Sequence, residues 1–423
     1  MQHVTVHAPA AKAYTLRALL LGALAEGTTR LKRPLLAEDQ LNMIGCLEGL
    51  GVRIRRESDE VFIEGIGGRF VPVVDELFVG DSGVTMNFLT SAACFASKPV
   101  VVGGTPRLNE RPIREVVEGV RQLGARIDYL GQPGFPPVRI LPGGLAGGRA
   151  AIHGAVTSQY FSSLVITSPL ARQPVTLVCL DDMTERPYFD ISTSMMRGFG
   201  VESQNDGYKT IEVAAPQPYH SQDLLVEGDF SSASFLFLVA AVQKRKVTVD
   251  GLNRESVQGD KRFLDLLQRM GCAVEWKGEA VTVTGGELVG LEQDMSDVPD
   301  LLPPLAIAAA FAKGESRFTR IGHLVHKESN RVVAMETELA KMGCTSWHDK
   351  ETYTVVGTNG QLHPATIHPY NDHRIAMSFA VAGLAVPGVK VENPGCVAKS
   401  FPDFWEYLER FHDPLASGCV RLS

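Results

Sequence analysis

The chain has 423 residues, 44% of them hydrophobic and 21% charged, and its formal net charge is −7 at pH 7. That length supplies a large apolar core and exceeds one ordinary domain, so the starting expectation is two domains. The acidic balance excludes a general attraction to nucleic acid or to an anionic membrane, and it makes small molecules the expected ligands.

The sequence shows no sign of export, membrane insertion or metal clustering. Residues 1–10 lack a charged stretch followed by an apolar one, and no apolar run reaches the roughly 18 residues that a spanning helix needs. The cysteines are odd in number, scattered and never spaced as Cys-x-x-Cys, so we predict neither disulfides nor a zinc site. We expect a cytoplasmic protein in which most of these side chains are small buried hydrophobes: Cys46, Cys94, Cys179, Cys272, Cys344, Cys396 and Cys419.

Along the chain, an Ala/Leu-rich helix that leads through a small or polar break into a β-branched strand recurs six times. Alanine on most sides lets such a helix pack closely all round, as expected for helices sandwiched between sheets. We therefore predict six buried helices, each followed by a strand. The pattern occupies residues 16–31, 88–102, 161–178, 233–249, 305–318 and 375–391.

A second, amphipathic helix type is interleaved with the first, and a glycine closes each copy. In the fourth copy, Phe263, Leu266, Leu267 and Met270 follow the i, i+3, i+4, i+7 spacing of one helix face. A glycine directly after such a face is typical of a left-handed helix C-cap. These glycines recur roughly every 70 to 75 residues, ahead of β-rich segments, at Gly51, Gly124, Gly200, Gly271 and Gly343.

The two patterns together predict an α/β protein of six repeated units, three to a domain, with the helices buried and the sheets outside. The natural boundary lies near residues 227–229, at the middle of the chain. Ordinary βα units with accidental periodicity are the alternative. Five glycines in one register favour a true repeat.

Cationic side chains lie at predicted loop-to-helix junctions in the first half of the chain. Lys12 and Arg17 flank the start of the first Ala/Leu-rich helix, where a cation opposes the helix dipole unless an anion offsets it. Arg107 and Arg111 lie on a strand-to-helix loop, where a guanidinium can bind a carboxylate or phosphate through two parallel hydrogen bonds. Taken singly, each site is also explained by solvated surface charge, or by a pair between Arg107 and Glu110.

The second half of the chain repeats this arrangement. Lys327 and Arg331 are four residues apart on one face of a predicted helix, while Glu328 is displaced by about 100°. An exposed stripe of ion pairs is the alternative interpretation. Asn371 or Asp372 is the candidate N-cap of the last Ala-rich helix.

Three further polar residues follow that cap. His373 is a satisfied buried histidine, a contact of Asp372, or a group that handles protons, because histidine titrates nearest neutrality. Arg374 is next to it, and Lys399 precedes the final amphipathic helix. In a repeat architecture these junctions stack on one face. A common cleft between two such faces would hold on the order of seven cations, enough for a phosphate and two carboxylates.

A series of short motifs lies in order over nearly the whole chain. The first half contains Lys-x-x-x-x-Arg at 12–17, Pro-Arg-x-x-Glu-Arg-Pro-Ile at 106–113, Ser-Gln at 158–159 and Arg-Pro-Tyr at 186–188. The second half contains Glu-Gly-Asp-x-Ser-Ser-Ala-Ser at 227–234, Gln-Gly-Asp at 258–260, Pro-Asp at 299–300, Lys-Glu-x-x-Arg at 327–331, Asn-Asp-His-Arg at 371–374 and Ala-Lys-Ser-Phe-Pro at 398–402. In these motifs the chain resembles the enolpyruvyl transferases, and specifically the 5-enolpyruvylshikimate-3-phosphate synthase family.

The resemblance implies a two-domain inside-out α/β barrel of six βαβαββ repeats, three per domain. It places residues 11–227 in one domain and residues 1–10 with 228–423 in the other, with the active site in the cleft between them. The implied reaction adds the 5-hydroxyl of shikimate 3-phosphate to phosphoenolpyruvate, and the tetrahedral ketal phosphate then expels phosphate. No metal, organic cofactor, nucleic acid or membrane is implied, and we expect a monomer.

The resemblance also implies which residues act, while the acid and the base of each step stay open. Proton-exchange roles are implied for Lys12, Asp300, Glu328 and His373. Phosphoenolpyruvate would be bound by Lys12, Gly83, Arg111, Gln159, Arg331, Arg374 and Lys399. The acceptor would be bound by Arg17, Thr157, Ser158, Gln159, Glu185, Tyr188, Asp300, His323 and Lys327.

Several positions depart from the family pattern, mostly among the acceptor residues. Ala13 and Glu185 replace usual serines, Asn87 an expected arginine and His323 a common asparagine, and residues 80–84 read Gly-Asp-Ser-Gly-Val. The Glu185 carboxylate would repel a substrate phosphate about 4 Å away by roughly 1 to 4 kcal/mol. A paralogue that uses another acceptor alcohol, such as a nucleotide or sugar, and a catalytically silent binding homologue therefore stay open. The cell-wall relative that acts on a nucleotide sugar is disfavoured, because the arginine loop lacks the reactive cysteine usual there.

Overall fold

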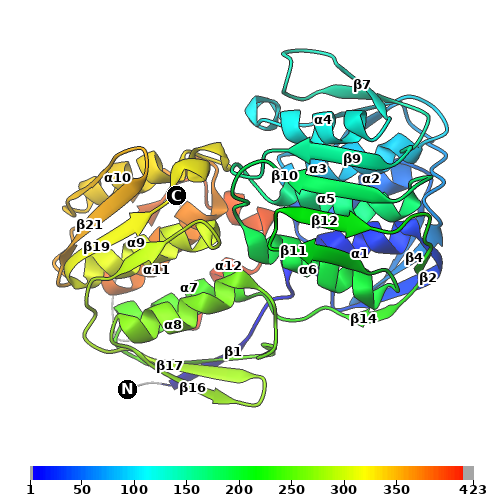
Figure 1. The fold of residues 1–423 in the computed structure, drawn as a ribbon. Helices are drawn as coiled ribbons and strands as arrows, with labels where there is room; N and C mark the ends of the chain where they lie inside the picture. Colours follow the sequence, from blue (N-terminus) through cyan, green and yellow to red (C-terminus); the bar gives the residue numbers. More distant parts are fainter. Residues whose placement is uncertain (1–2, 413–423) are drawn as a thin grey trace. The chain divides into compact units, whose positions relative to one another are not determined.

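Two hydrophobic cores form in the computed structural model, which describes residues 3–412. One core belongs to a unit of residues Lys12–Val226, called here the N-terminal unit. The other belongs to the C-terminal unit, which joins Met1–Ala11 to Glu227–Ser423. Both units mix helices with strands (Figure 1), so the predicted mixed α/β class is confirmed.

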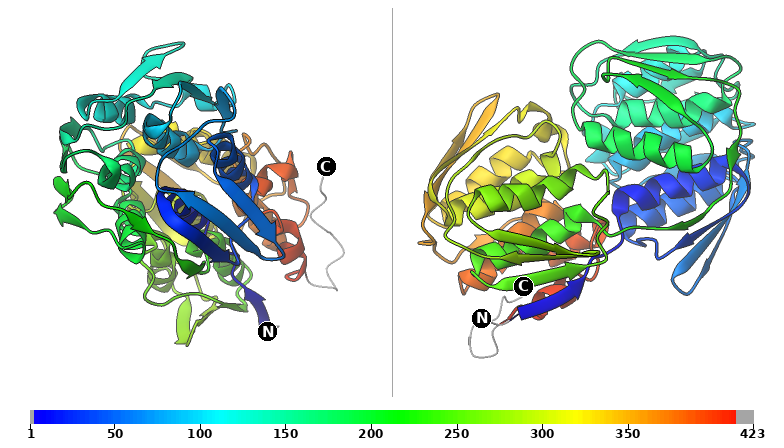
Figure 2. Two further views of the ribbon diagram at one scale, coloured as in Figure 1. Left: turned by 90° about the vertical axis from the view of Figure 1, so that its right-hand side faces the viewer. Right: turned by 60° about the horizontal axis from the view of Figure 1, so that its bottom comes forward.

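Within the described residues, six buried helices carry the Ala/Leu-rich pattern, as predicted. Helix α7 has the longest run of buried residues. All of its residues are buried, so the helix must be covered on all sides. Figure 2 shows the helices of each unit lying side by side, with strands outside them. The helices and the strands that follow them are α1 (Lys12–Leu24) and β2 (Ala25–Lys32), α3 (Gly83–Ala92) and β6 (Val100–Gly103), α5 (Gln159–Thr167) and β10 (Val175–Cys179), α7 (Phe230–Val242) and β15 (Lys246–Asp250), α9 (Leu302–Phe311) and β19 (Lys313–Thr319), and α11 (His373–Ala385) and β23 (Lys390–Val391).

The amphipathic helices end at the predicted glycines. In α8 (Arg262–Arg269) the predicted apolar face, including Phe263 and Leu267, is buried. All five glycines adopt the left-handed conformation, which side chains with a Cβ rarely enter, so the predicted C-caps are confirmed. Their φ angles are 92° at Gly51, 97° at Gly124, 87° at Gly200, 110° at Gly271 and 82° at Gly343. The other helices of this type are α2 (Glu38–Gly49), α4 (Arg114–Gln122), α6 (Arg186–Gly198), α10 (Arg331–Lys341) and the final α12 (Phe404–Glu409).

One strand order recurs in five sheets of the described chain: a parallel pair extended by two antiparallel strands. In the first of them β1 (His3–His7) pairs with β15, Val4 opposite Val247, which ties the start of the chain into the C-terminal unit. The orders are β1-β15-β17-β16, β9-β10-β12-β11, β14-β2-β4-β3 with β13 also on β2, β18-β19-β21-β20 and β5-β6-β8-β7. Strands β22 and β23 form a separate two-stranded parallel sheet. None of these sheets closes into a barrel within residues 3–412.

The remaining strands complete these sheets, and β4, β8, β12, β17 and β21 each lie between two neighbouring strands. Their bounds are β3 (Arg53–Glu57), β4 (Glu60–Ile66), β5 (Glu76–Phe78), β7 (Arg126–Tyr129), β8 (Val138–Leu141), β9 (Gly148–Ile152), β11 (Ser203–Asp206), β12 (Thr210–Val213), β13 (Tyr219–His220), β14 (Asp223–Leu225), β16 (Ala273–Lys277), β17 (Ala280–Thr284), β18 (Glu292–Asp294), β20 (Ser346–His348), β21 (Thr352–Thr358) and β22 (Thr366–Ile367). Of the helices in the part of the chain described, none is long and apolar enough to cross a membrane.

The described cysteines are free thiols that pack as small apolar side chains. Burial raises the pKa of Cys46 to about 12, so its thiol stays protonated at neutral pH. Cys419 lies outside the described residues. The thiols at Cys46, Cys94, Cys179, Cys272 and Cys344 are buried, and Cys396 is half-buried.

Aspartate side chains cap two of the buried helices in the C-terminal unit. Asp229 accepts a hydrogen bond from the backbone N–H of Ser231 at the start of α7, at 3.0 Å. Asp372 accepts one from the backbone N–H of Arg374 at the start of α11, also at 3.0 Å. Asp372 is therefore the N-cap, one of the two predicted candidates. The cap places Arg374 in the first turn of α11.

A buried glutamate supports the turn that leads into α11. Tyr370 and Asn371 have φ angles of 55° and 56°, a left-handed conformation that is costly for residues other than glycine. Glu338 of α10 is fully buried and accepts hydrogen bonds from the Tyr370 hydroxyl and the His368 backbone N–H, each at 3.0 Å. These contacts hold the turn, and with it the first residues of α11.

We expect Glu338→Ala to lower the free energy of unfolding of the C-terminal unit by about 3 kcal/mol, because the Tyr370 hydroxyl and the His368 N–H lose a buried, charged acceptor. The three tryptophans of the chain, Trp276, Trp347 and Trp405, all lie in this unit, so tryptophan fluorescence in urea reports its unfolding. The exposed Glu406→Ala is the matched control, with an expected change within about 0.5 kcal/mol. Equal losses in the two variants would contradict the support given by Glu338.

Candidate active site

A buried arginine organises the charged side chains of the C-terminal unit. Arg331 opens α10, and its side chain is 1% exposed. Its Nη1 donates to Asp300 at 2.5 Å, its Nη2 to Glu328 at 2.9 Å and its Nε to Asp372 at 2.9 Å. Burial by itself lowers the pKa of an arginine, but these three carboxylates raise the pKa of Arg331 well above its usual value.

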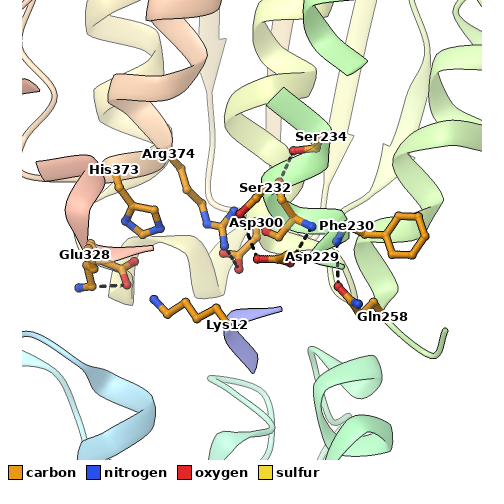
Figure 3. A network of polar contacts seen from close by, with 12 residues as sticks. Lys12, Asp229, Phe230, Ser232, Ser234, Gln258, Asp300, Glu328, His373 and Arg374 are labelled. Carbon is orange, nitrogen blue, oxygen red and sulfur yellow. Dashed lines mark hydrogen bonds and ion pairs between the residues drawn. The ribbon is translucent and has the colours of Figure 1, made fainter. Parts of the chain in front are cut away.

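Asp300 is shared between two arginines. Its second oxygen accepts a hydrogen bond from Nη2 of Arg374 at 2.8 Å (Figure 3), while Nη1 of Arg374 donates to the Ser231 hydroxyl. Burial alone would raise the pKa of Asp300, but Arg374, Arg331 and Lys327 hold it well below its usual range. Asp300 is therefore ionised at neutral pH, and in this state it can accept a proton but has none to donate.

The other residues predicted for this unit are buried around the same group. Lys399 ends the short helix η7 (Pro394–Lys399), and its Nζ lies 3.4 Å from Glu328. His373 is buried in the first turn of α11 (Figure 3). Two more buried side chains of the predicted set are Lys327 and His323.

These contacts bring together residues that are far apart in the sequence. We refer to Asp300, Glu328, Arg331, Arg374 and Lys399 as the arginine cluster. Its cations and carboxylates offset one another, and buried pairs of this kind are frequent where an enzyme binds anions or moves protons. Of the predicted site residues in this unit, the structure thus joins five in one network.

In the N-terminal unit, Lys12 opens α1 and pairs with a carboxylate that the sequence did not single out. Its Nζ lies 2.6 Å from Asp39 in the first turn of α2, and the Asp39 side chain is 4% exposed. The Gln40 side-chain amide donates to the Lys12 carbonyl at 3.3 Å. An acidic residue in the first turn of a helix is common, so the sequence carried no specific signal for this pair.

Arg17 is buried within the N-terminal unit and joins α1 to α6. Its Nε donates to the Ser192 hydroxyl at 2.7 Å, and Nη2 to the Tyr188 carbonyl at 2.8 Å. The guanidinium also lies over the Phe88 ring, 5.3 Å from its centre. Burial lowers the pKa of Arg17 to about 10, which still leaves it charged at neutral pH. These contacts give Arg17 a packing role, and its predicted contact with the acceptor stays a prediction.

Arg111 lies against the N-terminal end of α3. A Cβ atom on Gly83 would come within 2.6 to 2.8 Å of the Arg111 guanidinium, so the glycine permits this close approach. One turn further, the Asn87 amide donates to the Gly83 carbonyl at 3.0 Å and to Gln159 Oε1 at 3.1 Å. The predicted residues Gly83, Arg111 and Gln159 therefore lie around the first turns of α3 and α5.

Three predicted acceptor residues meet at the start of α6. Glu185 is buried and has a φ of 58°, and its carboxylate accepts a hydrogen bond from the Thr157 hydroxyl. The Ser158 hydroxyl donates to the Glu185 backbone carbonyl at 2.8 Å. Glu185 therefore holds the loop before α5 through both its side chain and its backbone. Tyr188 follows in the first turn of α6.

Sequence reasoning also missed the role of Ser231. It lies inside the motif at 227–234, but its partner Arg374 is 143 residues away, and no spacing rule connects the two. Within residues 3–412, no group of three or more His, Cys, Asp or Glu side chains is arranged to hold a metal ion. The chemistry that the described side chains can perform is anion binding and proton transfer.

Comparisons with known proteins cover nearly the whole chain. A family model described as EPSP synthase (3-phosphoshikimate 1-carboxyvinyltransferase) matches residues 2–408. A relative named 3-phosphoshikimate 1-carboxyvinyltransferase from Methanoculleus marisnigri is 44% identical over 404 residues, which is 95% of each chain. One of the same name from Serratia proteamaculans is 41% identical over 410 residues, 96% of this chain and 95% of its own. A solved structure of EPSP synthase from Acinetobacter baumannii has a TM-score of 0.81 at 27% identity, covering 97% of this chain and 96% of that chain.

We expect the C-terminal unit to lose stability progressively as the pH falls below about 5, because a carboxylate with a depressed pKa stabilises the fold fully above its unfolded pKa and loses this effect as the pH falls towards its folded pKa. Asp300→Asn should be about 3 kcal/mol less stable at pH 7 and should show a shallower acid loss. Urea unfolding followed by tryptophan fluorescence at several pH values measures both effects. The exposed Asp265→Asn should keep the wild-type profile. A wild-type acid slope in Asp300→Asn would refute this account.

Proposed function

The chain belongs to the EPSP synthase (3-phosphoshikimate 1-carboxyvinyltransferase) family, and we propose that it transfers the carboxyvinyl group of phosphoenolpyruvate to the 5-hydroxyl of shikimate 3-phosphate, with release of phosphate. The observation that carries the proposal is the buried arginine cluster in a chain that matches this family over nearly its full length. Such a transferase serves the shikimate pathway, which leads to the aromatic amino acids.

Phosphoenolpyruvate carries a phosphate and a carboxylate, and the proposed cations suit both groups. Arg331 and Arg374 present planar guanidinium groups, which bind such anions through paired, charge-assisted hydrogen bonds. In the free protein Asp300 occupies donors of both arginines, so the ligand must compete with this carboxylate. The same cations would stabilise the charge on the departing phosphate. We assign to phosphoenolpyruvate Lys12, Gly83, Arg111, Gln159, Arg331, Arg374 and Lys399.

The reaction needs three proton transfers. The acceptor hydroxyl loses a proton, C3 of phosphoenolpyruvate gains one, and the resulting methyl group loses one as phosphate departs. Asp300 suits the first transfer because it is ionised, and it becomes a stronger base once the ligand takes over its arginines. For the transfers at C3 the candidates are Lys12, Glu328 and His373, without a fixed order.

The two units are proposed to be the two domains of this family, with residues 11–227 in one and residues 1–10 with 228–423 in the other. Each would contain three βαβαββ repeats in an inside-out α/β barrel, with the active site in the cleft between the domains. The six buried helices, the five glycine caps and the recurring strand order support this reading. Closure of the domains over both substrates follows from the proposal.

The proposed ligands are two small anions, and the protein is proposed to act as a cytoplasmic monomer without nucleic acid or membrane partners. Two residues of the proposed acceptor set, Glu185 and His323, depart from the family pattern, so a different acceptor alcohol is the second candidate. The buried Glu185 carboxylate favours this candidate, because it lies in the loop proposed to hold the acceptor phosphate. The acceptor set is Arg17, Thr157, Ser158, Gln159, Glu185, Tyr188, Asp300, His323 and Lys327.

Steady-state release of phosphate from phosphoenolpyruvate and shikimate 3-phosphate tests the activity directly. We expect Lys12→Met to reduce the rate at least about 100-fold, because it removes a cation and a proton-exchange group from the reacting atoms. Lys98→Met is the matched control, since Lys98 forms an exposed pair with Asp75 at 3.0 Å, and it should keep the wild-type rate. Wild-type release no faster than that of Lys12→Met would end the proposal.

The proposed placement of Glu185 near the acceptor predicts a change in specificity. Glu185→Gln keeps a hydrogen-bond acceptor for Thr157 but removes the negative charge, so KM for shikimate 3-phosphate should fall about tenfold. KM for phosphoenolpyruvate serves as the internal control and should stay unchanged. Equal shifts of both KM values, or no shift, would place Glu185 away from the acceptor phosphate.

A further inference from the structure

A second buried carboxylate lies close to Arg374 and has no role in the account above. Asp260 belongs to the short helix η4 (Gly259–Lys261) and is 4% exposed. This helix packs against α7, the helix that carries Ser231 in its first turn. The charges of both Arg374 and Asp300 act on the Asp260 carboxylate.

The Ser231 hydroxyl connects Asp260 to Arg374. Nη1 of Arg374 donates a hydrogen bond to the hydroxyl oxygen, and the Ser231 side chain also hydrogen-bonds to Asp260. An arginine has only donors and a hydroxyl has a single proton, so the serine accepts from Arg374 and donates to Asp260. Such a chain polarises each of its members. Asp260 therefore attracts the charge of Arg374 through one intervening hydroxyl.

Arg374 thus serves two carboxylates that titrate differently. Asp300 contacts it directly and stays ionised at neutral pH. Burial raises the pKa of Asp260 to about 7, the charge of Asp300 adds to this rise, and Arg374 and Ser231 oppose it. Near neutral pH, Asp260 is the member of the pair that can change its charge.

The other charged groups around Asp260 are engaged elsewhere. Lys261 donates to two backbone carbonyls, each at 2.8 Å, and Arg262 pairs with Asp297 at 3.6 Å. The negative charge of Asp229, which caps α7, also raises the pKa of Asp260, but by less than the charge of Asp300 does. After burial, the charges of Asp300 and Arg374 have the largest effect on the pKa of Asp260, and an anion that binds the guanidinium would add to them.

We propose that Asp260 is a positioning residue for Arg374: its carboxylate holds the guanidinium through Ser231 in the free protein, and it takes a proton from solvent when phosphoenolpyruvate binds. The inference rests on the proposed function for the identity of the anion. Negative charge on the ligand makes a second nearby charge costly, so the Asp260 carboxyl group becomes neutral and no longer competes with the ligand for the charge of Arg374. No other bond is made or broken in this step.

Calorimetric titration of phosphoenolpyruvate into the full chain counts the protons taken up. The titrations are run at pH 7.5 in Tris and in HEPES, whose ionisation enthalpies differ, for the wild type, Asp260→Asn and the exposed control Asp265→Asn. We expect the wild type and the control to take up about half a proton more per bound ligand than Asp260→Asn. Protons exchanged by the ligand itself cancel in this comparison.

A second variant and a pH series make the test independent of one substitution. Between pH 6 and 9 the affinity of the wild type should fall about tenfold more than that of Asp260→Asn. Ser231→Ala should lose most of the wild-type excess in proton uptake, because it cuts the connection while keeping the Asp260 carboxyl group.

Equal proton counts in the wild type and Asp260→Asn would overturn the inference, as would a wild type that does not bind phosphoenolpyruvate. A protein that binds the ligand but releases no phosphate would overturn the proposed function instead. In that case the proton count still decides the role of Asp260.

Discussion

Burying a guanidinium group costs several kcal/mol unless carboxylates and hydroxyls replace the water it loses, and this requirement governs the C-terminal unit. Arg331 meets it with three carboxylates, and Arg374 meets it with Asp300 and the Ser231 hydroxyl. A bound anion supplies the same kind of compensation. Under the proposed function, the contacts that stabilise the free protein are therefore the contacts with which the ligand would compete.

The fold explains why the charges gather at helix ends. Helices such as α7 and α9 are covered on all sides, so their middle turns have room only for apolar and small side chains. Polar groups are accommodated in the first turns, where capping carboxylates such as Asp372 accept hydrogen bonds from backbone N–H groups and from arginine side chains. Arg331, Arg374 and Lys12 all lie in first turns. The turn held by Glu338 fixes one of these ends.

Each unit balances its own cations with internal carboxylates. Lys12 pairs with Asp39, and Lys399 lies close to Glu328, so an acidic chain can present cations without a large unpaired charge. Such pairs also set how readily a proton moves, because the gain or loss of a neighbouring charge changes the pKa of the remaining carboxyl group. Under the proposed function, anion binding and proton transfer would be properties of one network.

Periodicity along the sequence determined the buried helices and the left-handed glycines, because these features depend on residues within a few turns of each other. Capping preference limited the N-cap of α11 to Asn371 or Asp372, and the structure identified Asp372. Motif resemblance also predicted all five members of the arginine cluster. Only the tertiary structure identified Asp39 as the partner of Lys12, and Ser231 and Asp260 as the groups linked to Arg374. A carboxylate or hydroxyl has no local signature of its partner, and the choice among many such groups depends on how helices from distant segments pack together.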